Sequence, residues 1–500
     1  MSNGSALVLR WMPAFLQPYV ARIQNSPLGY RLARGAFWSL LGTLISQGLG
    51  LAALVLVARM LGKEGFGELG VIQNTVGMFG VFAGFGLGVT ATKHVAEFRV
   101  KDPEKAGRIM TLCGLVAVGS GGLMALVLML SAPWLAAHTL AAPHLSDLLQ
   151  IGAGLLFLNA LNGTQTGALA GFEAFRNITT VNLWAGLTKF PLMVGGAYVA
   201  GVTGAVWGLV ASTGINWLLN HLALRREARR AGVSFQLLRG CGQEWRVLHG
   251  FSLPALLSGA MVVPVQWASM AMLVNQPGGY AEMGVYNAAL VFKGIMMFLG
   301  TTMSAPLLSM VAYEKASSKS RLSKVNILLT WGLGVFFALP LLCFPELAQM
   351  LYGEKFNDVS FKHTFVLIVF ITCIMVYKQG LARVLIASSL LWWSFLSNLI
   401  WGILVLVSAF FLVKWGAVGL AVAFAIAYVF NTLVFVPWYL GLGLVPRSTL
   451  ISFEASAIWL IISILSIINW IDAPITLRFL FFTISILAIT VCFKRLIKAS

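Results

Sequence analysis

Charged side chains are scarce in this chain, and acidic ones are the scarcest. Only 10% of its 500 residues are charged, 16 acidic against 34 basic, whereas 59% are hydrophobic. A soluble domain has about 25% charged residues because its surface faces water. The composition excludes a soluble protein of this size and predicts an all-α polytopic membrane protein. The net charge of +18 lies in short loops between apolar runs, so nucleic-acid binding is not expected.

Motifs for catalysis and metal binding are also absent. The five cysteines are odd in number and widely spaced, which argues against a disulfide framework and a CxxC metal site. Neither GxxxxGK[ST] nor HExxH occurs. No loop between apolar runs is long enough for a nucleotide-binding or catalytic domain. We therefore predict no catalytic residue, no metal ligand and no cofactor, and we expect a protein that is not an enzyme.

Long apolar runs are what the sequence has in abundance. A helix needs about 20 apolar residues to cross roughly 30 Å of hydrocarbon. Two divisions rest on the short breaks at 201–204 and 414–416, so twelve or thirteen crossings stay open as alternatives to fourteen. The fourteen predicted helices span about 36–59, 69–92, 108–130, 147–171, 181–200, 204–224, 248–274, 284–312, 325–345, 363–382, 391–413, 417–440, 451–470 and 476–493.

The distribution of Lys and Arg predicts the orientation. With the N-terminus inside, inner segments hold 26 of these residues and outer segments hold 6. Cytoplasmic loops of membrane proteins carry such an excess. Both termini are therefore predicted to be cytoplasmic, and the loops near Ala137 and Asn357 periplasmic. No cleaved signal peptide is expected, because Arg10, Pro13 and Pro18 interrupt the first apolar stretch.

Internal repeats divide the chain into two halves. GFGELGV at 65–71 recurs as GYAEMGV at 279–285, and GAVWGL at 204–209 recurs as GAVGL at 416–420. Many transporters consist of two related halves. We predict a cytoplasmic segment at 1–35, a six-helix bundle at 36–224, a basic cytoplasmic linker at 225–247, a second bundle at 248–440 and two extra helices at 451–493.

Several motifs resemble one family of transporters. They are RGAFWS at 34–39, LGKEGFG at 61–67, GLGVTATKHVAE at 86–97, GALAGFEAF at 167–175, and VLIA at 384–387 followed by LWW at 391–393. Together they resemble Wzx-type polysaccharide and O-antigen flippases, which belong to the multidrug/oligosaccharidyl-lipid/polysaccharide exporter superfamily. The resemblance covers about 34–440.

The resemblance implies a fold, a cargo and a localisation. It implies two MATE-like six-helix bundles that alternate between inward-open and outward-open forms in the bacterial inner membrane. The implied cargo is an undecaprenyl-pyrophosphate-linked oligosaccharide, carried from the cytoplasmic to the periplasmic leaflet for O-antigen, capsule or exopolysaccharide synthesis. Its partners would be this lipid-linked oligosaccharide, membrane lipids and polysaccharide assembly proteins.

Four basic residues are candidates for binding the diphosphate of such a cargo. An ionisable residue inside a membrane helix costs at least about 2.5–3.5 kcal/mol and is a functional candidate by default. Lys189 and Lys293 lie in the middle of their predicted helices, one in each half. Lys378 and Arg383 lie near the inner end of a helix, where a positive-inside anchor is the alternative.

Polar uncharged residues form a second candidate set. Asn159, Asn162 and Gln165 follow one face of a predicted helix, and Gln47 and Gln266 lie within other predicted helices. Amides suit sugar hydroxyl groups, so these residues are predicted to line the path of the sugars. Hydrogen bonding between helices is the alternative.

Residues at helix ends are candidates for gating or ion coupling. Glu68 and Glu282 occupy matching repeat positions at the predicted outer surface, and Arg59 and Lys93 also lie at helix ends. A solvated carboxylate near Lys63 is the simpler interpretation of Glu68. No acid lies deep within a predicted helix, which disfavours a cation-coupled drug exporter and leaves coupling to a proton or sodium gradient open.

The sequence favours a lipid-linked oligosaccharide flippase over three alternatives. Two are transporters: a cation-coupled multidrug exporter and a flippase for the peptidoglycan lipid precursor. The third is a membrane glycan polymerase or ligase, which would need catalytic side chains on a large outer loop. The outer loops here have fewer than twenty residues.

Overall fold

In a computed structural model, the protein is a bundle of long α-helices. The structure describes residues 27–234, 240–248, 252, 260–302, 321–388, 390–444, 449, 451–471 and 473–498. No strand occurs within these residues. The main helices are α3 (Pro27–Gly84), α4 (Leu87–Phe98), α5 (Pro103–Trp134), α6 (Ser146–Gly171), α7 (Phe175–Arg230), α9 (Val262–Val274), α10 (Gly279–Thr302), α12 (Arg321–Cys343), α13 (Glu346–Tyr352), α14 (Val359–Ala387), α15 (Leu391–Leu412), α16 (Gly416–Gly441), α17 (Phe453–Trp470) and α18 (Ile475–Lys498).

The described helices confirm the all-α membrane fold that the apolar runs predict. Among the residues that the structure describes, nine stretches are long and apolar enough to cross a membrane, and some of them contain two consecutive predicted helices. α3 is interrupted at Gly62 (φ 75°) and α7 at Gly201 (φ 58°), where glycine adopts a left-handed conformation at little cost. A short turn at Val413–Trp415 separates α15 from α16. The predicted breaks near 201 and 414 are therefore correct, and the arrangement is consistent with about fourteen crossings.

Three predicted boundaries differ from the structure. The predicted helix at 69–92 is broken at Phe85 and Gly86, which both have positive φ and separate α3 from α4. The basic linker predicted from residue 225 begins as helix, because α7 continues to Arg230. α3 begins at Pro27, inside the segment 1–35 predicted to precede the first membrane helix. Residues 1–26, most of 249–259 and 303–320 lie outside the described part, so the rest of that segment and the inner parts of two predicted helices are not described.

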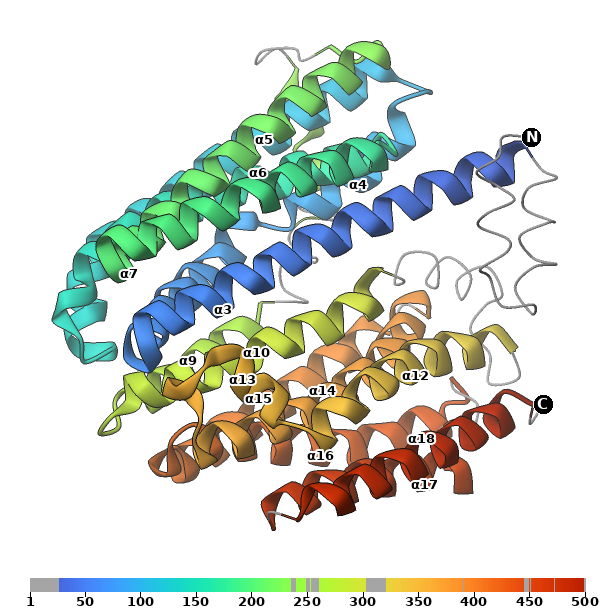
Figure 1. Ribbon diagram of the computed structural model, residues 1–500. Helices are drawn as coiled ribbons and strands as arrows, with labels where there is room; N and C mark the ends of the chain where they lie inside the picture. Colours follow the sequence, from blue (N-terminus) through green and yellow to red (C-terminus); the bar gives the residue numbers. More distant parts are fainter. Residues whose placement is uncertain are drawn as a thin grey trace, which may run out of the picture.

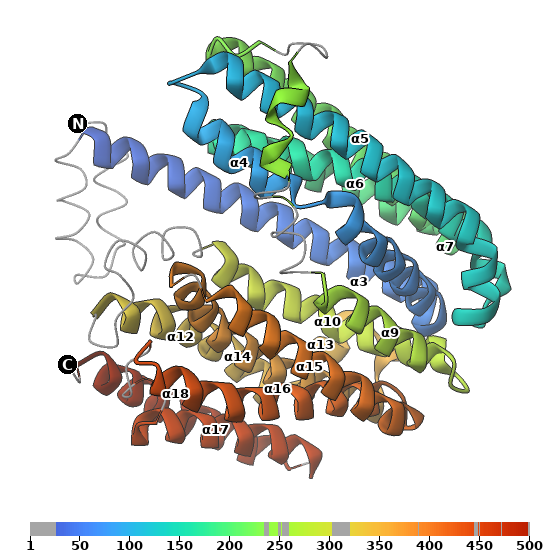
Figure 2. The same ribbon diagram turned by 180° about the vertical axis from the view of Figure 1, so that it is seen from behind.

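The helices form two groups, with α3 and α10 side by side between them (Figures 1 and 2). α4 to α7 lie on the side of α3, and α12 to α18 lie on the side of α10. α17 and α18 pack against the second group, through α12 and α14. This architecture is the predicted pair of bundles with two additional helices.

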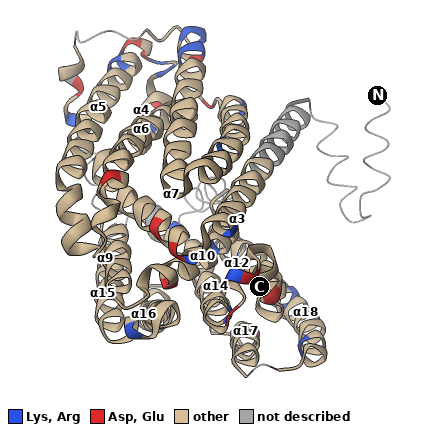
Figure 3. Cartoon of the chain, turned by 60° about the vertical axis from the view of Figure 1, so that its left-hand side comes forward, with Lys and Arg blue, Asp and Glu red and all other residues tan. Residues whose placement is uncertain are grey.

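The start of α3 and the end of α18 lie at the same end of the molecule (Figure 1). We call this the inner end and the opposite one the outer end, following the orientation predicted from charge. Gly62, Gly201 and Gly416 lie at turns of the outer end. Lys and Arg gather towards the ends of the helices, whereas the middle of the bundle has few charges (Figure 3).

Buried apolar side chains form two separate clusters among the described residues. The larger joins the two bundles, including Leu69 and Leu149 of the first bundle and Phe292 and Phe365 of the second. The smaller lies at the inner ends of the helices of the first bundle, around Ile109, and includes Cys241 and Leu248 from the segment that follows α7. The bundles therefore share a buried core towards the outer end, while the inner end of the first bundle has a core of its own.

The cysteines are expected to be dispensable. Cys113, Cys343 and Cys373 are buried, and Cys492 is half-buried; all are free thiols. They pack as small apolar groups. Replacing these four with alanine should leave membrane abundance, and the transport that the sequence resemblance implies, near wild type, measured by immunoblotting and complementation. A variant that reaches the membrane but transports nothing would show that a thiol has a role.

Candidate functional site

A polar cavity inside the first bundle is the strongest candidate site. It has a volume of about 350 Å³ and is lined by α3, α6 and both segments of α7. Nine of its thirteen lining residues have polar side chains, which is unusual in the middle of a membrane bundle. Its lining comprises Ser46, Gln47, Gly50, Asn159, Asn162, Asn182, Ala185, Gly186, Lys189, Leu209, Ser212, Thr213 and Asn216.

Lys189 supplies the charge of this cavity. It lies on the first segment of α7, and its side chain is half-buried. Within the described part of the chain, no hydrogen bond or ion pair is made by its amine. An ammonium group with three free donors, surrounded by amides and hydroxyls, can bind an anionic oxygen such as that of a phosphate.

Close helix packing positions the walls of the cavity. A Cβ atom at Gly186 would lie 2.6 Å from Oγ of Ser46, so α3 and α7 approach closely there. Ser46 donates to the carbonyl oxygen of Asn182 at 2.8 Å. On the opposite wall, Asn162 donates to the carbonyl oxygen of Thr213 at 3.2 Å. These contacts leave Lys189 between walls that are fixed by hydrogen bonds.

The predicted polar stripe on α6 is divided between two environments. Asn159 is exposed and lines the cavity, as does the exposed Gln47 of α3. Asn162 is buried and also accepts from Asn220 at 3.2 Å, so helix–helix bonding applies to this residue. Gln165 instead faces Trp217, with which its amide can form two bonds of 3.1 Å, and lines a different cavity.

The predicted substrate-binding residues of the second bundle do not line this cavity. Lys293 is half-buried on α10, and Gln266 is half-buried on α9. Lys378 of α14 donates to Oδ1 of Asn431 on α16. Arg383 is buried and binds α12, donating to Oδ1 of Asn326 at 2.6 Å and to Oγ1 of Thr330 at 3.1 Å.

The repeat segments meet at the outer end, where the two bundles touch. A Cβ atom at Gly67 would lie 1.9 Å from the carbonyl oxygen of Tyr280, and one at Gly284 would lie 1.9 Å from that of Lys63. Gly67 is the third residue of the first motif and Gly284 is the sixth residue of the second. α3 and α10 can approach this closely only because both positions lack a side chain.

Side chains reinforce this outer contact. Arg59 of α3 donates to the carbonyl oxygens of Leu351 and Met350, at 2.6 and 2.8 Å. Lys63 forms an ion pair with Asp358. The hydroxyl of Tyr280 donates to the carbonyl oxygen of Leu140 at 2.8 Å. The predicted gating candidate Arg59 therefore links the two bundles.

The two matching glutamates have different partners. Glu68 lies 2.8 Å from Nε2 of His144, whereas Lys63 pairs with Asp358. Glu282 accepts from the backbone N–H of Ala417 at 2.7 Å and thereby caps the start of α16. Lys93 is exposed in the middle of α4 and not at a helix end.

Ser46, Ser212 and Thr213 are cavity residues that the sequence analysis missed. Ser212, Thr213 and Asn216 lie within one helical turn of α7, and this spacing is a signal that could have found them. Ser46 has no such pattern, since it depends on the approach of Gly186. Within the described ranges, no group of three His, Cys, Asp or Glu residues is placed to hold a metal ion.

Comparison with known sequences gives a family and partial relatives. The model of a family described as "Polysaccharide biosynthesis protein" matches residues 32–295, more than half of the chain. The lipid III flippase of Escherichia coli (strain K12) is 32% identical over 101 residues, as is that of Shigella flexneri. These matches cover 20% of this chain and 24% of each relative.

Solved structures share the fold. The lipid II flippase MurJ in an inward closed conformation has a TM-score of 0.66 at 15% identity, covering 91% of this chain and 98% of that one. A multidrug resistance MATE family transporter of the MOP superfamily, in an inward-facing conformation, has a TM-score of 0.62 at 15% identity, covering 80% and 97%. At such low identity, these similarities bear on the fold alone.

Proposed function

The chain belongs to the polysaccharide biosynthesis protein family, and on this premise we propose that it is a flippase for a lipid-linked oligosaccharide. The cargo is an undecaprenyl-pyrophosphate-linked repeat unit, moved from the cytoplasmic to the periplasmic leaflet by alternating access. Its sugars serve O-antigen, capsule or exopolysaccharide synthesis. No covalent bond is made or broken in this proposal, and no cofactor takes part.

The polar cavity around Lys189 carries the proposal. A lipid tail can remain in the hydrocarbon, but sugars and a diphosphate need polar partners on their way across. The amides of Gln47 and Asn159 can bond to sugar hydroxyls, and the free ammonium of Lys189 can bond to a phosphate oxygen. These three residues are predicted site residues that the fold brings to one cavity.

The same cavity favours this cargo over an apolar drug. Most of its lining residues have polar side chains, so an apolar drug would gain few apolar contacts there. Its one charged lining residue is the cation Lys189, so a cationic drug would lose its hydration without gaining an opposite charge. The peptidoglycan lipid precursor also has a diphosphate and remains the second candidate, supported by the shared fold with the lipid II flippase.

Alternating access requires that one end opens while the other closes. The outer end is closed by the contacts of Gly67 with Tyr280 and of Arg59 with α13, and the buried core that joins the bundles lies there. We assign this arrangement to the stage at which cargo enters from the cytoplasmic side. A proton or sodium gradient is the proposed energy source, and polysaccharide assembly proteins are proposed partners.

The orientation is tested by labelling of single cysteines. Ala137 and Asn357 are exposed at the outer end, and Lys101 is exposed at the inner end. We expect an impermeant thiol reagent to label cysteines at 137 and 357 in intact spheroplasts, and one at 101 only after the membrane is broken. The reverse pattern would contradict the proposed topology.

The transport function is tested by following the cargo in cells. Depleting the protein should make a lipid-linked oligosaccharide accumulate in the cytoplasmic leaflet, while surface glycan falls. Extracted lipids are analysed by mass spectrometry, and accessibility to an added periplasmic glycosidase distinguishes the two leaflets. Depletion that leaves both the leaflet distribution and surface glycan unchanged would refute the proposal; accumulation of the peptidoglycan precursor instead would favour the second candidate.

A further inference from the structure

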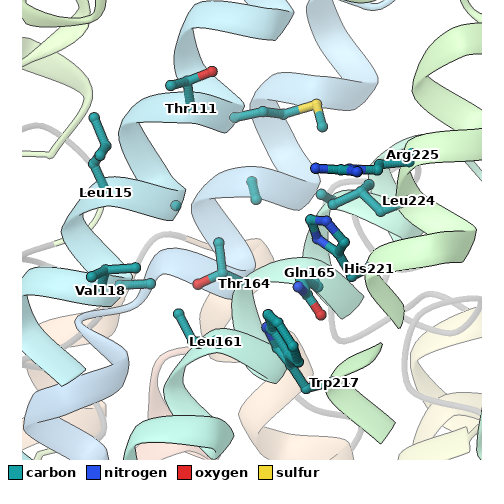
Figure 4. A pocket seen from close by; sticks show the side chains of 15 residues that line it. Thr111, Leu115, Val118, Leu161, Thr164, Gln165, Trp217, His221, Leu224 and Arg225 are labelled. Atoms are coloured by element: carbon teal, nitrogen blue, oxygen red, sulfur yellow. The ribbon is translucent and has the colours of Figure 1, made fainter. Parts of the chain in front are cut away.

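A second cavity lies on the opposite side of α6 and α7 from the Lys189 cavity. It has a volume of about 380 Å³ and is lined by α4, α5, α6 and the second segment of α7. None of its lining residues lines the Lys189 cavity. Figure 4 shows Leu115 and Val118 of α5 on one side, facing His221 and Trp217 of α7 on the other.

The cavity is apolar over most of its wall and opens towards the bilayer. Leu115 and Val118 are 44% and 50% exposed, so the α5 side faces the surrounding lipid rather than another helix. Leu161 and Ala168 of α6 form part of its apolar wall. An acyl chain fits such a lining without losing any hydrogen bond.

Cationic and polar groups lie at its inner end. Arg225 and His221 are one turn apart on α7, and Thr111 lies across from Arg225 at the same rim (Figure 4). His221 is stacked on Trp217, with ring centroids 5.7 Å apart. In the described part of the chain, Arg225 has no ion pair or hydrogen bond, so its guanidinium is free to bind an anion.

The depth of these groups matches that of a lipid headgroup. Arg225 lies five residues before the end of α7, and Arg226, Arg229 and Arg230 follow it, all exposed. Thr111 lies eight residues after the start of α5, about 12 Å along the helix. Basic pockets between helices at the cytoplasmic side bind anionic lipid headgroups.

We propose that this cavity, here called the Arg225 cavity, binds an anionic glycerophospholipid of the inner leaflet. Its phosphate contacts Arg225, His221 and Thr111, and one acyl chain lies against Leu115, Val118 and Leu161. An isoprenoid phosphate also has an anionic head and an apolar chain. We assign the sugar-bearing isoprenoid to the Lys189 cavity, because that cavity has the amides that can bind sugars. The phospholipid is therefore a resident ligand, bound while cargo moves on the other side of α6 and α7.

The test measures lipid binding to the purified full-length protein. Phosphatidylglycerol and phosphatidylcholine with the same chains are added separately, and bound lipid is measured by native mass spectrometry and thermal unfolding. We expect one phosphatidylglycerol to resist dissociation and to raise the Tm more than phosphatidylcholine does. Arg225→Gln should weaken this binding about fivefold. The matched control Arg226→Gln, whose side chain does not line the cavity, should bind as wild type.

A second pair of variants tests the space in the cavity instead of its charge. A Cβ atom at Gly114, which lines the cavity, meets no other atom within 4 Å, so Gly114→Leu can enter the empty space. Gly119→Leu, on the same helix and equally unobstructed, is the control. We expect Gly114→Leu to abolish tight phosphatidylglycerol binding and Gly119→Leu to retain it.

Three results would overturn the proposal. They are equal binding of the two phospholipids, equal binding by Arg225→Gln and Arg226→Gln, and retention of binding by Gly114→Leu. Undecaprenyl phosphate forms a further arm: if it binds more tightly than phosphatidylglycerol in an Arg225-dependent manner, the occupant is an isoprenoid and the phospholipid assignment is wrong. None of these measurements depends on transport.

Discussion

Replacing Lys189 with alanine is expected to reduce transport at least tenfold while the protein still reaches the membrane. A hydrogen bond to a charged group contributes about 1.5–3 kcal/mol, which corresponds to roughly 10–100-fold in binding. Lys189 lines the polar cavity and has no protein partner among the described residues, so its removal breaks no observed contact. The measurement is complementation of a flippase-null strain, scored by surface glycan and normalised to membrane protein.

Matched variants separate a role in binding from a role in folding. Lys189→Arg should retain part of the activity, because the charge remains while the planar group reaches differently. Lys414→Ala, at an exposed outer turn, is the control and should transport as wild type. Lys293→Ala should have a smaller effect than Lys189→Ala, since Lys293 does not line the cavity. Wild-type glycan from Lys189→Ala would remove the cationic cavity from the proposed mechanism.

Apolar runs and turn glycines predicted most of the long helices of this fold. The breaks near 201 and 414 follow from a simple limit, because 44 or 50 residues cannot fit in one crossing. The break at Phe85 could not be predicted, since a positive φ at phenylalanine is held by packing rather than by its own preference. Local sequence does not contain that packing information.

Only part of the candidate site could be predicted, because the sequence does not show how the helices face one another. Helical spacing places Asn159, Asn162 and Gln165 near one another, but it does not identify the helix that each one faces. In the structure Asn159 faces the cavity, Asn162 binds Thr213, and Gln165 meets Trp217. These outcomes depend on how α6 and α7 cross, which is a property of the folded bundle.

The same limit applies to the charged residues. Lys189 and Arg383 both lie in apolar helices, and the sequence assigns both to a cavity. Arg383 instead has Asn326 and Thr330 as partners on α12, whereas Lys189 has none in the described part of the chain. The decisive difference is a hydrogen-bond partner on another helix: for Arg383 it is Asn326, 57 residues away in sequence.

Gly67→Ala is expected to open the outer end, although alanine normally stabilises a helix by about 1 kcal/mol relative to glycine. Its Cβ would lie 1.9 Å from the Tyr280 carbonyl oxygen, and ordinary contact requires about 3.4 Å. α3 and α10 would have to separate by about 1.5 Å. Overpacking of this kind costs about 1–3 kcal/mol. The closed outer contact should therefore become roughly 5–100-fold less populated relative to the open one.

Labelling of a buried reporter measures this opening. Asn74 is half-buried beside Asn287 at the α3–α10 contact, so Asn74→Cys should react with an impermeant reagent mainly when the outer end opens. We expect at least tenfold faster labelling with Gly67→Ala, together with reduced transport. Gly77→Ala is the matched control, because it lies on the same helix and its Cβ would meet nothing within 4 Å. Equal labelling rates in the two variants would show that the glycine contact does not hold the outer end closed, and the proposed gate would have to depend on Arg59 and Lys63 instead.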